Sequence, residues 1–344
     1  MRLHTLSLVL LAIAGLSDRT TLEDPTQAPP DPFGETVAEK LAWPFEGSFA
    51  QQRIWHNYSY ATEDGAHAGL RFVQRAGTEV RAVAGGVVAV LDDEVGLILA
   101  PDATSDVGWW YGGLESELEA GATVASGDVL GRVADRDGGI TGLSLAHVKF
   151  ARDDAGALEV ESTTDPLRFF DAPDETKPRI ATRMHFVRDE TLEEFEGDED
   201  GFPHVEGKVD IIAALGDSAG LGQSGQWGVP VVTLEIVDGE GKRVLSTLVL
   251  DLRGPLKPGH SMLPLQVFDD RDVEPYTRGL WGWPKLSFLR LTNTDGDGLV
   301  EPEDAEHSWD TTQIANGRYR VIVRAWDLAG NMAERKVGVF VEND

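Results

Sequence analysis

Short segments in which apolar and polar residues alternate, separated by glycine, constrain this fold most. They occur over 79–93, 95–102, 122–135 and 143–160, and again over 179–187, 208–215, 229–252 and 317–341. Alternation with a period of two is typical of strands with one buried face, and helical periodicity is almost absent. The sequence therefore predicts an all-β protein.

Two segments with linker composition divide the chain. Residues 18–40 are rich in Pro, Asp and Thr, and residues 173–178 read "PDETKP". We therefore expect a first β-domain over 41–172 and a second over 179–344. In the second domain, the turns "DGEG" and "DLAGN" predict hairpins, and the regular short strands predict a β-sandwich. Its final hairpin, with Tyr319 placed like a corner tyrosine, resembles immunoglobulin- or fibronectin-type domains.

The N-terminus has the features of an export signal. Arg2 precedes an apolar run from Leu6 to Leu16, and small residues follow. The run is too short to cross a bilayer, which favours a cleaved signal peptide over 1–17 rather than an anchor. The chain has no cysteine, so it has neither a disulfide framework nor a lipid-attachment cysteine. We expect an exported bacterial protein, periplasmic or extracellular, that does not span the membrane.

The formal net charge of −29 limits the partners. It excludes nucleic-acid binding by bulk electrostatics and disfavours an anionic membrane surface.

Several motifs of the first domain follow a recognisable order. They are "WPFEGSF" (43–49), "HAGLRFVQRAGTEVRAVAGGVVAV" (67–90), "WYGGL" (110–114), "LEAGATVASGDVLGRV" (118–133) and "AHVKFA" (146–151). In this order the domain resembles the LytM- and lysostaphin-type zinc endopeptidases, which cut peptide cross-bridges in bacterial cell walls. By this resemblance "WPFEGSF" is the opening strand, "LEAGATVASGDVLGRV" matches glycine-punctuated strands, and the other three motifs hold the positions of the metal site and its assisting histidines.

The resemblance implies a degenerate zinc site. The family holds zinc with the His and Asp of a His-x-x-x-Asp motif and with the second His of His-x-His, and two further histidines assist. Here His67 keeps the first ligand position, Arg71 stands at the Asp position, and Lys149 at the last His. Of the assisting positions, His147 survives and Gly113 replaces the other. Because cations do not ligate zinc, we expect no zinc hydrolysis, with His67 and His147 vestigial.

Two alternatives remain for this groove. A rebuilt zinc site could use His56, Glu63 and Asp64, which precede His67. Otherwise Arg71 and Lys149 together form a positive spot where the metal would sit, and this spot either receives a carboxylate from a ligand or pairs with an acidic residue of the chain.

Aromatic residues could add to a binding cleft. Trp109, Trp110 and Tyr111 either line a sugar- or peptide-binding surface or belong to the core of the domain.

The segment "NTDGDGLVEPED" (293–304) has the spacing of a calcium loop. Oxygen side chains lie at its positions 1, 3, 5, 9 and 12, Gly298 lies at position 6, and Leu299 offers a backbone carbonyl. The oxygen-bearing residues are Asn293, Asp295, Asp297, Glu301 and Asp304. The loop resembles those of EF-hand and dockerin-type modules, although Pro302 and the lack of a clear exiting helix depart from them. A plain connection between strands is the alternative.

The sequence thus predicts an exported cell-envelope protein with a non-catalytic LytM-like domain that binds peptidoglycan or a wall-remodelling partner. The first alternative is a metalloendopeptidase with a rearranged zinc site. The second is a structural spacer, with the immunoglobulin-like domain as the binding module.

Overall fold

The computed structural model describes residues 26–30, 40–62, 65–92, 96–135, 141–152, 158–195, 197, 201–218, 227–262, 265 and 286–344. The expected signal peptide (1–17) and most of the linker at 18–40 lie outside these residues. The all-β prediction is confirmed, because every helix among the described residues is a 3₁₀-helix of five residues or fewer. The described residues contain no helix with the length and hydropathy that a membrane span requires.

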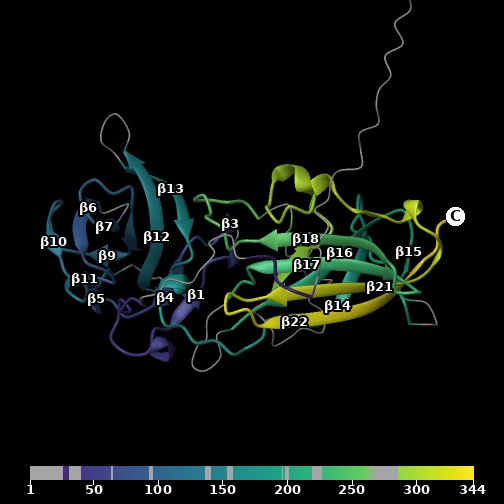
Figure 1. The fold of residues 1–344 in the computed structure, drawn as a ribbon, viewed down its shortest axis with the longest axis horizontal. Coiled ribbons are helices and arrows are strands. Elements are labelled where there is room, and N and C mark those ends of the chain that lie inside the picture. The colour runs from purple at the N-terminus through teal and green to yellow at the C-terminus, as the bar shows by residue number, and fades with distance from the viewer. Residues whose placement is uncertain are drawn as a thin grey trace, which may run out of the picture.

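The first region consists of a large sheet and a small sheet (Figure 1). The large sheet has the order β1-β4-β12-β8-β7-β6-β10, with β13 also paired to β12; the small sheet is β5-β11-β9, and β2 and β3 form a separate pair. The elements are η1 (Phe49–Gln51), β1 (Ile54–His56), β2 (Ala61–Thr62), β3 (Gly65–Ala66), β4 (Leu70–Val73), β5 (Glu79–Arg81), β6 (Gly86–Asp92), β7 (Gly96–Ala100), β8 (Val107–Gly112), β9 (Leu114–Glu115), β10 (Thr123–Val124), β11 (Val129–Val133), β12 (Gly142–Arg152), β13 (Leu158–Thr164) and η2 (Pro166–Phe169).

Alternation along the strands gives the large sheet two faces. The inner face packs with the small sheet in one core, which includes Leu70, Tyr111 and Leu145 of the large sheet and Val80 and Leu130 of the small one. The outer face carries a second, smaller cluster of buried apolar residues, which comprises Ile98, Ala100, Ala146, Val148 and Phe150.

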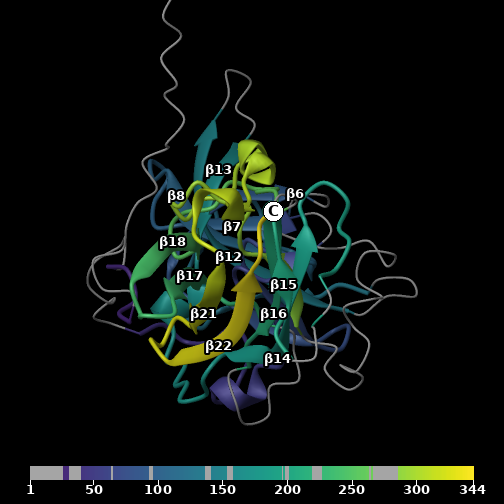
Figure 2. The ribbon, with the colours of Figure 1, turned by 90° about the vertical axis from the view of Figure 1, so that its right-hand side faces the viewer.

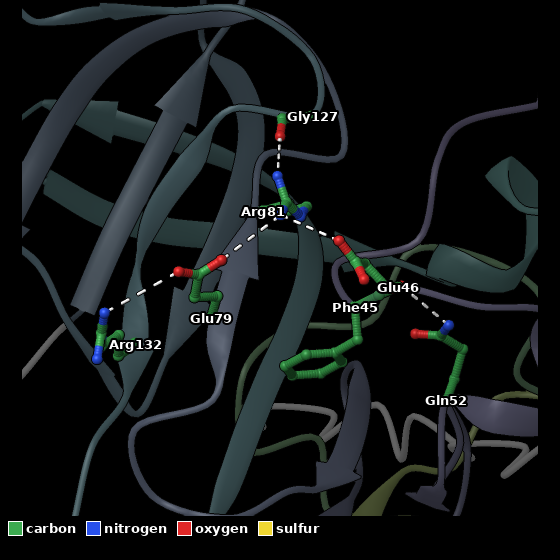
Figure 3. Close-up of polar contacts among 7 residues, drawn as sticks. All are labelled: Phe45, Glu46, Gln52, Glu79, Arg81, Gly127 and Arg132. Atoms are coloured by element: carbon green, nitrogen blue, oxygen red, sulfur yellow. Dashed lines mark hydrogen bonds and ion pairs between the residues drawn. The ribbon is translucent and has the colours of Figure 1, made fainter.

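The opening segment of this region differs from expectation. Residues 43–49, predicted as a strand, form bends that lead into η1. Phe45 and Phe49 reach the core from this irregular path. Arg81 of β5 fixes the segment: its backbone N–H donates to the Pro44 carbonyl, and its guanidinium pairs with Glu46 at 3.2 Å (Figure 3). Tertiary contacts therefore replace the ladder hydrogen bonds that a strand would have made.

The second region is a β-sandwich, as predicted. One sheet has the order β14-β16-β19 with β20 beside β16, and the other has the order β15-β22-β21-β17-β18 (Figure 2). Apolar residues of both sheets form one core. The elements are β14 (Arg179–Arg188), β15 (His204–Val205), β16 (Lys208–Gly216), β17 (Val231–Asp238), β18 (Arg243–Asp251), β19 (Ser287–Arg290), η3 (Pro302–Glu306), β20 (Trp309–Asp310), η4 (Thr311–Gln313), β21 (Gly317–Trp326) and β22 (Met332–Val341).

Both predicted hairpins of this region form. The chain turns from β17 to β18 and from β21 to β22 with Gly241 and Gly330 at positive φ, as these turn sequences require. The Tyr319 hydroxyl donates to the carbonyl of Ala315, four residues upstream, at 2.7 Å. This is the contact expected of a corner tyrosine. An immunoglobulin-type relationship itself remains a prediction.

The two regions interlock. Tyr58, from the first region, is fully buried in the core of the sandwich, while Trp227, from the second, belongs to the core of the first region. The Tyr58 hydroxyl lies 2.8 Å from the Thr163 carbonyl oxygen and accepts the N–H of Leu256 at 2.9 Å. Thr163 and Leu256 also exchange two backbone hydrogen bonds. The boundary near 173–178 therefore separates the chain into two regions that still share buried contacts.

Candidate functional site

One of the motif positions of the zinc peptidases, His67, lies in the wall of a pocket on the outer face of the large sheet, which we call the β12 pocket. It has a volume of about 570 Å³. Its lining is mostly apolar and comprises Ala66, His67, Ala68, Gly69, Leu70, Trp110, Ser144, Ala146, Val148, Val160, Thr163, Pro258 and Gly259. The last two come from the second region, so both regions form its wall.

Arg71 belongs to the outer face of the sheet. In the pairing of β4 with β12, Arg71 lies opposite Ser144, and its guanidinium donates to the Ser144 Oγ at 2.9 Å. Since Ser144 lines the β12 pocket, the positive charge of Arg71 lies at the pocket's edge.

His147 and Lys149 both lie on β12, and their side chains point to the inner face of the large sheet. The register of β12 with β8 is continuous from Ser144 to Lys149, so side chains of odd-numbered residues point away from Arg71. The His147 ring packs on Trp109 and Phe169, with centroids 5.1 and 4.6 Å apart. Burial lowers the pKa of His147 to about 4. His147 is thus a neutral ring packed among aromatic side chains.

Lys149 is half exposed and pairs with Glu161 of β13 at 3.1 Å. This hydrogen bond and charge raise the Lys149 pKa. The expectation that Arg71 and Lys149 make one positive spot is therefore wrong, since they lie on opposite faces. For the same reason His67 and His147 do not face each other across a groove.

His67 lies in the wall of the β12 pocket. Its Nε2 is buried without a hydrogen-bond partner, and burial, followed by the nearby His56 and Arg71, lowers its pKa to about 3. The imidazole is therefore neutral at physiological pH. The His56 ring stands edge-on to it, with centroids 5.6 Å apart, and stacks on Tyr60.

The donors around this pocket do not suit zinc. On β12 the register places Ser144 opposite Arg71, with Ala146 on the same face, so the two motif positions of this strand, His147 and Lys149, offer no donor to the pocket. Among the described residues, no three His, Cys, Asp or Glu side chains converge here. Glu63 and Asp64, the other ligands of the hypothetical rebuilt site, lie outside the described residues. The imidazoles of His67 and His56 beside a guanidinium, without a carboxylate among the described residues, make a poor zinc site.

The three consecutive aromatic residues divide between the two faces. Trp109 and Tyr111 are buried in the core of the first region, and the Tyr111 hydroxyl accepts the N–H of Val83. Trp110 alone of the three lines the β12 pocket. Trp109 and Tyr111 therefore belong to the core of the domain, and ligand binding by Trp110 stays a prediction.

The segment 293–304 forms a compact loop with Gly298 at positive φ, as its spacing predicts. The Asp304 carboxylate accepts the N–H groups of Asp295 and Glu301, and Asp297 accepts that of Leu299, whose side chain is exposed. Asn293 is buried. The loop carboxylates bond to the loop's own backbone, and calcium binding there stays a prediction.

The sequence matches no protein-family model, and a search of curated protein sequences found no match. Among solved structures, the chain is similar to Helicobacter pylori Csd3 (17% identity, 39% of this chain and 34% of Csd3, TM-score 0.29). It is also similar to the catalytic domain of lysostaphin, an antimicrobial peptidase from Staphylococcus simulans (18% identity, 34% of this chain and 87% of that domain, TM-score 0.26), and to a putative M23 peptidase from Pseudomonas aeruginosa (21%, 36% and 49%, TM-score 0.25).

The aligned part thus spans about a third of Csd3 and about half of the Pseudomonas protein. Because these TM-scores are below 0.5 and the identities below 25%, membership of the LytM-type family remains a prediction from the motifs.

Proposed function

We propose that this chain is an exported cell-envelope protein whose first region binds a short peptide of the cell wall, or of a wall-remodelling partner, without hydrolysing it. The observation that carries the proposal is the β12 pocket. The donors that the described residues offer are unsuited to zinc, yet the pocket keeps an apolar lining and a guanidinium at its edge.

The chemistry of the pocket suggests the kind of ligand. Small apolar side chains, such as those of alanine, fit beside Ala146, Val148 and Val160, and the Trp110 ring offers a flat apolar surface. Arg71 can pair with a ligand carboxylate through a charge-assisted hydrogen bond, and a neutral His67 adds no competing charge. A carboxylate-bearing, alanine-rich stem peptide meets both conditions.

Calorimetric titration with a muropeptide tests this proposal, using two variants that remove the same charge. Arg71→Gln should weaken binding by about tenfold or more, because a hydrogen bond to a charged group contributes roughly 1.5–3 kcal/mol. Lys149→Gln, on the opposite face, should bind like the wild type. Amidating the ligand carboxylate should reproduce the loss in the wild type and add little to Arg71→Gln. Equal affinities of both variants and the wild type would refute the proposed role of the pocket.

A metalloendopeptidase with rearranged ligands is the second candidate, favoured by the proximity of His56 to His67. Metal analysis combined with a peptidoglycan-clearing assay distinguishes the two. Stoichiometric zinc together with clearing that His67→Ala abolishes would establish the peptidase. If wall binding persists after substitutions throughout the β12 pocket, the second region is the binding module and the first a spacer.

A further inference from the structure

Three aspartates from distant parts of the chain meet where the two regions join. Asp174 lies in the connecting segment, Asp217 directly follows β16, and Asp327 directly follows β21. One carboxylate oxygen from each lies within 4.8 Å of the others. All three line a pocket of about 520 Å³, which we call the junction pocket and which residues 167–172 of the first region also line.

Two of these carboxylates are almost completely buried. Asp217 and Asp327 are each 5% exposed, and Asp174 is partly buried. Burial raises the pKa of Asp217 to about 7; the charges of Asp327 and Asp174 add to this effect, while a hydrogen bond from the Ser218 N–H and the charge of Arg179 oppose it. Burial also raises the pKa values of Asp174 and Asp327. Three acidic groups this close repel one another when ionised, and they have lost much of their hydration.

The local hydrogen bonds leave one buried acceptor unused. Asn331 holds Asp327 through its backbone N–H and its Nδ2, both at 2.8 Å, and the same Nδ2 donates to the Asp174 carbonyl at 3.0 Å. The Asp174 carboxylate accepts the N–H of Thr176. The Oδ1 of Asp217, however, is buried without a hydrogen-bond partner. An orphaned buried carboxylate oxygen is unfavourable, and a bound cation or a retained proton would relieve it.

We propose that Asp174, Asp217 and Asp327 together bind one Ca²⁺ ion at the junction of the two regions. The donors are oxygens only, which suits a hard divalent cation rather than zinc or copper. Calcium binds oxygen at about 2.4 Å, so two ligands on opposite sides of the ion are about 4.8 Å apart, and all three oxygens fit around one ion. Magnesium requires a tighter octahedron and retains more water.

This ion links elements that the backbone connects only distantly. Asp174 belongs to the segment between the regions, while Asp217 and Asp327 follow strands of the two opposed sheets of the sandwich. Binding therefore holds the connecting segment against the ends of both sheets and fixes the junction. The site is separate from the loop at 293–304 and from the β12 pocket.

Calcium titration of the metal-stripped full chain tests the inference, with calorimetry and the melting temperature as readouts. Calcium should bind and raise the melting temperature of the wild type by several degrees. Asp217→Asn keeps the side-chain shape but removes the charge, so it should weaken calcium binding at least tenfold and abolish the calcium-dependent rise. Without calcium, the same variant should melt at or above the wild-type temperature, because the repulsion among the carboxylates is relieved.

Two further variants keep the test decisive. Asp174→Asn changes the partly exposed aspartate of the cluster and should also weaken calcium binding. It tests the site even if Asp217→Asn fails to fold. Asp297→Asn changes the loop at 293–304 and should leave the response to calcium intact. A response lost in Asp297→Asn but kept in Asp174→Asn and Asp217→Asn would assign calcium to the loop and overturn the inference. The absence of any binding at millimolar calcium, or a response to magnesium alone, would overturn it equally.

Discussion

The substitution Asp165→Asn should make the protein more stable in neutral and alkaline solution, by an amount that depends on pH. Asp165 is fully buried at the start of η2, where its Oδ1 accepts the N–H of Leu167 at 2.8 Å and its Oδ2 has no hydrogen-bond partner. Burial raises its pKa from 3.8 to about 7, against the opposing effects of that N–H and of Arg168. The folded protein therefore keeps a proton on this group that the unfolded chain releases near pH 4.

The magnitude follows from this shift. A raised folded-state pKa gives stability that is fully present below the unfolded pKa and lost as the pH rises through the folded pKa. About three pKa units correspond to about 4 kcal/mol, lost by the wild type between roughly pH 4 and pH 8. Asparagine has no such proton and is an equally good cap for the N–H of Leu167. The variant should therefore gain up to about 4 kcal/mol over the wild type as the pH rises from 4 to 8.

Urea denaturation followed by tryptophan fluorescence measures this difference, since the chain has nine tryptophans. Both proteins are unfolded at pH 4, 6 and 8, and the variant's unfolding free energy is compared with the wild type at each pH. Contributions from all other titrating groups cancel in this comparison. If the difference is the same at all three pH values, the Asp165 carboxyl does not carry a raised pKa, and the reasoning fails.

Three further predictions concern other buried groups. By NMR, the His67 ring should show no titration between pH 5 and 8, because its lowered pKa of about 3 keeps it neutral; a midpoint near 6.5 would contradict its burial. Tyr319→Phe should lower the unfolding free energy by about 0.5–1.5 kcal/mol through loss of the bond to Ala315, and an unchanged urea midpoint would show that bond to be neutral. Glu235→Ala should destabilise by about 3–5 kcal/mol, because it leaves the buried Arg324 without a 2.8 Å partner; a loss below 1 kcal/mol would mean that Glu334 alone compensates it.

The strands and hairpins could be predicted because their signals are local. Alternation with a period of two marks a strand, and glycine in "DGEG" and "DLAGN" marks a turn, whatever the rest of the chain does. The bends at 43–49 could not be predicted in this way, because contacts made by Arg81, distant in sequence, determine the path of that segment.

The arrangement of side chains at the candidate site could not be predicted from each strand alone, because it depends on how neighbouring strands pair. The motif order correctly suggested that Arg71 and "AHVKFA" lie on neighbouring strands, and β4 indeed pairs with β12. Which side chains share a face depends on the pairing register, and a shift of one residue exchanges the faces. Because Ser144 of β12 lies opposite Arg71, the side chain of Lys149 points to the other face of the sheet. The aspartates at 174, 217 and 327 have no shared motif, and only the tertiary fold brings them together.

The exchange of Tyr58 and Trp227 between the two cores has a consequence for any attempt to divide the protein. Asn57 reinforces it, since its side-chain amide and the backbone of Gly228 exchange two hydrogen bonds. Each half alone would expose an apolar notch that the other half normally fills. A chain cleaved by a protease within 173–178 should therefore stay together as a noncovalent two-piece complex and elute as one species in size-exclusion chromatography. Halves expressed separately should be poorly soluble alone and should recover when mixed, as fragments of one folding unit do.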